Sequence, residues 1–162
     1  MSPEGGGAGG DPVEAWLLGE LRAGRPVSFR ALGGSMWPAA RAGGRVTLEP
    51  AARPPRRGEV WVFVDPDAPE GARLSPLHRV VWVAGGRAWC KGDALARLDD
   101  PRPAAAALGR LCAVEGAGRL RAALAAPRGA LGRFAGWALC VGQGGGRWAL
   151  IGARLLLCVR KS

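Results

Sequence analysis

Several residue types are scarce in this chain of 162 residues, and each scarcity argues against a class of site. Histidine occurs once, at position 78, and no two of the four cysteines form a Cys-x-x-Cys pair. A structural zinc site needs four Cys or His ligands at short spacings. We therefore expect no metal and no cofactor, and we interpret the four cysteines as buried thiols: Cys90, Cys112, Cys140 and Cys158.

Tyrosine is absent, and acidic residues are outnumbered, with 13 Asp and Glu against 23 Lys and Arg. The resulting formal charge of +10 is compatible with nucleic-acid binding. No basic run, however, is interleaved with aromatic residues as a base-stacking surface requires. We therefore expect no nucleic-acid partner.

Long apolar runs are also missing. No stretch approaches the about 20 apolar residues that a membrane-spanning helix needs, so a conventional span is not predicted. Residues 1–11, MSPEGGGAGGD, lack the basic flank and apolar centre of a secretory signal. We expect this segment to be a flexible lead.

The part of the chain over residues 116–162 contains no Asp or Glu but eight basic residues. Apolar clusters at 131–141 and 148–159 indicate helices, and the second is too short to cross a bilayer at 1.5 Å per residue. Two interpretations of this tail remain open. Its helices either lie on an anionic membrane surface or pack on the preceding domain as core. The sequence therefore predicts a protein that is peripheral to a membrane or cytoplasmic, without naming the side of the membrane.

What is present between residues 12 and 115 predicts one mainly β domain. Asp11 and Pro12 are typical of a helix start and Gly24 of a helix end, which predicts a helix over 13–23. Alternating apolar residues then predict short strands, separated by turns rich in Pro and Gly. These segments are 26–31, 45–48, 59–64, 77–84, 87–90 and 108–114. Short strands without helices between them favour an antiparallel, partly closed β fold.

The segment GGSMWP places Ser35 between two glycines and Met36-Trp37-Pro38, directly after the first predicted strand. Glycine, serine and proline are common in surface turns, so a plain turn is one interpretation. The other is an exposed nucleophile. The single histidine, His78, begins an apolar strand, and carboxylates follow at positions 93, 99 and 100. Serine, histidine and a carboxylate are the groups that hydroxyl-nucleophile chemistry needs.

Four segments in this order resemble the signal peptidase I superfamily: GGSMWPAARAGGRV, PPRRGEVWVFV, LHRVV and CKGDALARLDD. The resemblance covers about residues 26–114. It is to the form with histidine where the common bacterial enzymes carry a catalytic lysine, a form typical of archaeal and endoplasmic-reticulum signal peptidases and of some short bacterial relatives. It implies a serine endopeptidase that acts through an acyl-enzyme.

The resemblance also implies a role for each matching residue. Ser35 would be the nucleophile, His78 the general base and Asp99 the acid, with Asp100 as the close alternative. Asp93 of the KGD motif would shape the site or support the triad. The residues themselves agree with these roles, because Gly33 and Gly34 would let the backbone reach an oxyanion-binding geometry. Met36 and Trp37 would form an apolar lip or simply be core or rim residues. An extended peptide would pair along the edge of the site, with shallow pockets that select small side chains.

Three departures from the family pattern leave alternatives open. Gly33 stands where relatives often carry a hydroxyl residue that donates to the oxyanion, so backbone N–H groups would have to serve. Gly43-Gly44 and Gly58-Glu59 replace two Gly-Asp pairs, and the usual N-terminal membrane anchor is missing. The alternatives are an inactive peptidase fold that serves as a binding scaffold, and a self-cleaving repressor relative. The latter would need a lysine base and a DNA-binding domain. A Ser–Lys dyad with Lys91 is the weaker choice for the base, because His78 and not Lys91 stands at the family's lysine position.

Overall fold

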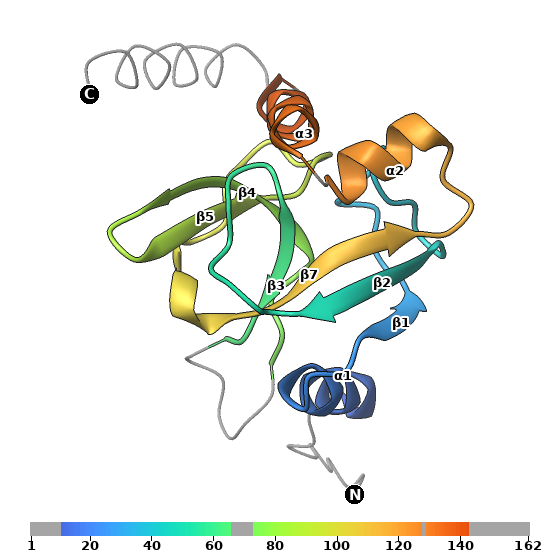
Figure 1. The fold of residues 1–162 in the computed structure, drawn as a ribbon, viewed down its shortest axis with the longest axis vertical. Coiled ribbons are helices and arrows are strands. Elements are labelled where there is room, and N and C mark those ends of the chain that lie inside the picture. The colour runs from blue at the N-terminus through green and yellow to red at the C-terminus, as the bar shows by residue number, and fades with distance from the viewer. Residues whose placement is uncertain (1–10, 66–72, 128, 143–162) are drawn as a thin grey trace, which may run out of the picture.

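The computed structural model describes residues 11–65, 73–127 and 129–142 (Figure 1). The chain begins with helix α1 (Pro12–Arg22), where the side chain of Asp11 accepts a hydrogen bond of 2.9 Å from the Val13 N–H. Leu17, Leu18 and Leu21 lie on the buried face of this helix. The helix predicted over 13–23 is thus confirmed, displaced by one residue toward the N-terminus.

A curled antiparallel sheet makes up most of the described chain (Figure 1). Its strands follow in the spatial order β1-β2-β7-β3-β4-β5-β6, and every neighbouring pair is antiparallel. This arrangement confirms the predicted fold class. The strands are β1 (Val27–Arg30), β2 (Arg45–Pro50), β3 (Val60–Phe63), β4 (His78–Ala84), β5 (Arg87–Lys91), β6 (Arg102–Pro103) and β7 (Ala107–Val114).

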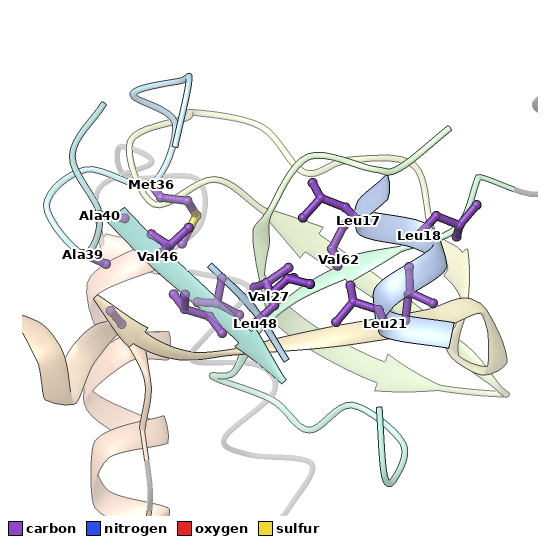
Figure 2. Close-up of a cluster of buried hydrophobic side chains, with 14 residues drawn as sticks. Leu17, Leu18, Leu21, Val27, Met36, Ala39, Ala40, Val46, Leu48 and Val62 are labelled. Carbon is purple, nitrogen blue, oxygen red and sulfur yellow. The ribbon is translucent and has the colours of Figure 1, made fainter. Parts of the chain in front are cut away.

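The main hydrophobic core lies between α1 and one half of the sheet (Figure 2). The leucines of α1 occupy one end of this cluster, and Met36, from the turn after β1, lies beside Ala40 and Val46 at the other. Each buried aliphatic side chain of this size stabilises a fold by about 1.5–3 kcal/mol. The core therefore fixes the turn that carries Ser35 to the body of the sheet.

The carboxylate of Glu59 is also buried. This residue belongs to Gly58-Glu59, one of the two pairs that replace Gly-Asp in the family pattern. Burial raises the pKa of Glu59, but hydrogen bonds from Arg53, from the Trp61 indole and from the Arg56 N–H outweigh that effect and hold the pKa below its ordinary value. The preceding Gly58 has φ +87, and a Cβ there would lie 2.1 Å from the carbonyl oxygen of Arg133. Both residues therefore serve the packing of the fold.

Up to residue 142, where the described part of the chain ends, the sheet is followed by the helices α2 (Arg119–Ala125) and α3 (Ala130–Gly142). α3 packs against β4, burying Trp137 and Cys140, and the Trp137 indole donates to the Val81 carbonyl at 3.1 Å. The guanidinium of Arg57 lies 4.9 Å above the same indole ring. Within 119–142 the helices thus pack as the core interpretation of the tail expects, whereas the second apolar cluster, at 148–159, lies outside the described residues.

Candidate active site

The side chains of Ser35, His78 and Asp99 form one chain of hydrogen bonds. His78 Nε2 lies 3.1 Å from Ser35 Oγ, and His78 Nδ1 lies 2.6 Å from Asp99 Oδ2. His78 is 4% exposed, and the side chain of Asp99 is 23% exposed. A base placed between a hydroxyl and an orienting carboxylate is the arrangement that activates a serine for nucleophilic attack.

Ser35 lies in the tight turn that follows β1. The Trp37 N–H donates to the Gly34 carbonyl at 3.0 Å within this turn, and the Ala94 N–H donates to the Ser35 carbonyl at 2.8 Å. A Cβ on Gly92 would lie 2.8 Å from the same Ser35 carbonyl oxygen, closer than real Cβ atoms approach. The KGD motif therefore needs glycine at this position because a side chain there would collide with the backbone of the turn that carries Ser35.

His78 is the first residue of β4, where it pairs in register with Trp61 of β3. The strand is buried at this end, and the lone histidine is thus fixed by the sheet rather than by a loop. Asp99 comes from the loop after β5. That loop folds back on its own strand, since the Asp99 N–H donates to the Cys90 carbonyl at 2.8 Å.

The other two predicted carboxylates do not contact His78 in the described interactions. Asp100 is exposed, next to Asp99 but on the solvent side. Asp93 is fully buried and forms a two-pronged ion pair with Arg79, with Nε to Oδ1 at 2.7 Å and Nη2 to Oδ2 at 2.6 Å. It thus shapes the site indirectly, because its partner Arg79 directly follows His78.

Arg79 is a site-supporting residue that the sequence analysis missed. Besides Asp93 it donates to the carbonyls of Gly58 and Leu124, each at 2.8 Å, so one guanidinium joins β4, the turn before β3 and α2. A Cβ on Gly136 of α3 would lie 2.5 Å from Arg79 Nη1, so α3 also approaches it closely. A charged residue inside the apolar run LHRVVWV was the available signal, because a buried charge requires partners.

Lys91, the residue that a Ser–Lys dyad would require, is 2% exposed and directed at α3. Its Nζ donates to the Cys140 carbonyl at 2.5 Å and lies 3.8 Å from the Cys140 sulfur. A cation at the last carbonyls of a helix is favourable because it offsets the helix dipole. The contacts of Lys91 therefore belong to the docking of α3, while those of His78 belong to Ser35.

The predicted oxyanion and lip residues surround the serine. Gly33 and Gly34 have open space where a Cβ would project. Met36 is 4% exposed and belongs to the core, whereas Trp37 is 54% exposed at the rim. A pocket of about 410 Å³ opens beside Ser35 and is lined mainly by apolar side chains from α1, β1 and the segment before His78.

The cysteines in the described ranges take no part in this site. Burial raises the pKa of Cys90 and of Cys140 to about 12, which keeps both as thiols, and Cys112 is half-buried. Cys158 lies outside the described residues. Residues 11–65, 73–127 and 129–142 contain no group of three or more potential metal ligands.

Comparison of the chain with known protein families, with curated proteins and with solved structures finds no match. In the part of the chain that the structure describes, no helix has the length and apolar character to cross a membrane.

Proposed function

We propose that this chain is a serine endopeptidase of the signal peptidase-like type with a Ser–His–Asp centre. The observation that carries the proposal is the unbroken hydrogen-bond chain from Ser35 Oγ through the imidazole of His78 to the carboxylate of Asp99. Side chains 43 and 21 residues apart in sequence are brought into this order. The three residues are those that the resemblance implies.

The chemistry follows from the roles of these groups. Neutral His78 takes the proton of Ser35 through Nε2 as Oγ attacks the scissile carbonyl, and Asp99 stabilises the imidazolium that forms. The imidazolium then protonates the departing amine, which leaves an acyl-enzyme on Oγ. A water molecule, deprotonated by His78 in turn, attacks the ester, and collapse of the second tetrahedral intermediate returns the proton to Oγ.

A peptide substrate is favoured because β1, which leads directly into the serine turn, is an edge strand of the described sheet. An extended peptide can hydrogen-bond to such an edge as an added strand. The open space at Gly33 and Gly34 allows the substrate carbonyl to approach the backbone N–H groups of the turn.

The test is labelling with a fluorophosphonate probe, which reacts with activated serines. We expect the intact chain to be labelled at Ser35, and Ser35→Ala and His78→Ala each to lose labelling while remaining folded by circular dichroism. Absence of labelling in the intact, folded chain would instead favour the inactive scaffold. Labelling of Ser35→Ala would show that Ser35 is not the nucleophile.

We further propose that the protein binds anionic membrane surfaces peripherally through its C-terminal part. The support is the lack of any acidic residue after Glu115 together with Leu131 and Phe134, which are 82% and 51% exposed on α3. Basic residues beside exposed apolar side chains are the pattern that binds anionic lipid.

A further inference from the structure

The pocket beside Ser35 is large for a peptidase site that selects small side chains. Its volume of about 410 Å³ falls in the range of about 300–1,000 Å³ that is typical of pockets for small-molecule ligands. α1 forms one wall, the end of β1 and the residues after it form another, and the segment before His78 forms a third. The lining residues on which the argument depends are Leu17, Ala31, Met36, Ala40, Val62 and Leu77.

The pocket lies on the acyl side of the catalytic centre. Ser35 and Leu77 line it, but the next residue, His78, and the acid, Asp99, do not. The imidazolium must reach the leaving amine to protonate it, so the leaving group lies on the side of His78. A pocket that borders the nucleophile away from the histidine therefore receives the group attached to the scissile carbonyl.

Two small residues contribute to the space. Ala31 and Ala40 line the pocket close to the serine in sequence, among larger lining residues such as Phe29, Leu32 and Met36. α1 is tied to the opposite wall because Glu14 Oε2 accepts a hydrogen bond of 3.3 Å from the Leu74 N–H. The helix thus encloses a volume that the sheet alone would leave open.

We propose that this pocket binds a bulky apolar side chain, of the size of leucine or phenylalanine, on the acyl side of the scissile bond, with Ala31 setting the size limit. This inference rests on the proposed peptidase function. It differs from the small side chains that the resemblance implies. Discrimination follows because each additional buried methylene strengthens binding, whereas alanine leaves the apolar walls unfilled.

The first experiment compares peptidyl diphenyl phosphonates that differ only in the acyl-side residue. With the intact chain we expect the leucine and phenylalanine compounds to modify Ser35 at least about tenfold faster than the alanine compound. Ala31→Leu should abolish or reverse that preference, with Ala31→Val as the milder version if the leucine variant does not fold. Ala84→Leu, at an exposed position that does not line the pocket, is the matched control and should keep the preference.

The second experiment measures binding without reaction, in a variant that lacks the serine hydroxyl. Binding of leucine- and alanine-containing peptides to Ser35→Ala is measured by calorimetry, and we expect the leucine peptide to bind at least about tenfold more tightly. If no phosphonate reacts but this preference remains, the peptidase function fails and the pocket assignment stands. If the phosphonates react without preference, or if Ser35→Ala binds neither peptide or both equally, the pocket assignment is overturned.

Discussion

Asp99 determines which nitrogen of His78 carries the proton. Its carboxylate only accepts hydrogen bonds, so the 2.6 Å contact places the proton on Nδ1 and leaves the Nε2 lone pair directed at Ser35. The neighbouring Asp100 is exposed and has no such contact with His78 in the described interactions. Two adjacent carboxylates therefore have different expected roles.

We predict that Asp99→Asn lowers kcat by about 10,000-fold, because an amide can donate to Nδ1 and hold the imidazole in the wrong tautomer. Asp100→Asn, the matched control, should stay within about twofold of the parent, since charge changes at exposed sites have small effects. Turnover of a fluorogenic peptide measures both. If Asp99→Asn keeps its activity and Asp100→Asn is inactive, Asp100 and not Asp99 is the acid.

The sequence alone could not choose between these two residues. Both follow the KGD motif, and a motif specifies an approximate distance along the chain rather than a side-chain direction. The choice depends on the fold of the 92–99 loop, which is held by the long-range bonds from Ala94 to Ser35 and from Asp99 to Cys90. Ser35 and His78, by contrast, stand in short motifs of their own and were assigned from the sequence through the resemblance.

The larger elements were predictable where the local pattern matched their packing. Local sequence patterns and the Asp11 cap predicted α1 and six of the seven described strands, by alternation where one face is buried, as in β2, and by continuous apolar residues in β3, which is buried throughout. β6 was missed because a two-residue strand has no period, and only its pairing with Arg87 and Ala88 defines it. The docking of α3 was left undecided, since apolar residues on a helix do not indicate what covers them.

The docking of α3 leads to a prediction about Lys91. We expect Lys91→Met to keep the peptidase activity and the pH profile of the parent, because the ammonium contacts Cys140 of α3 rather than the nucleophile. The variant should lose about 1.5–3 kcal/mol of unfolding free energy, the value of a hydrogen bond to a charged group. Urea unfolding and a rate profile across pH measure the two effects.

A histidine base determines the direction in which the reaction rate changes with pH. Protonated imidazole cannot accept the proton of Ser35, so the rate should fall on acidification in both the parent and Lys91→Met. A Lys91→Met variant that is inactive yet as stable as the parent would restore lysine as the base.

At the scale of the whole molecule, charge and exposed apolar surface are unevenly distributed. α1 and α3 lie at opposite ends of the sheet in Figure 1, and every residue after Glu115 is neutral or basic. Truncation is a poor way to study the basic end, because α2 and α3 supply partners for Arg79 and Lys91. Point substitutions on the exposed face of α3 avoid that difficulty.

We predict that the full chain co-sediments with anionic vesicles at low salt and is released at high salt or from neutral vesicles. The double variant Leu131→Ser with Phe134→Ser should bind several-fold more weakly, since both side chains are exposed. Trp16→Ser, at a 48% exposed position on α1, is the control and should bind as the parent does. Full-length protein that stays in the supernatant at low salt would end the membrane proposal.

The contacts of α2 and α3 also place assembly of the catalytic centre late in protein synthesis. A ribosome delivers Ser35, His78 and Asp99 well before it delivers Leu124 and Cys140, whose carbonyls receive the buried cations of Arg79 and Lys91. Until then Arg79 has only Asp93 and the Gly58 carbonyl as described acceptors, and Lys91 lacks the acceptor that makes its burial tolerable. The nascent chain thus carries Ser35, His78 and Asp99 before the packing that supports them is complete, and that packing is complete only when translation has passed the last turn of α3.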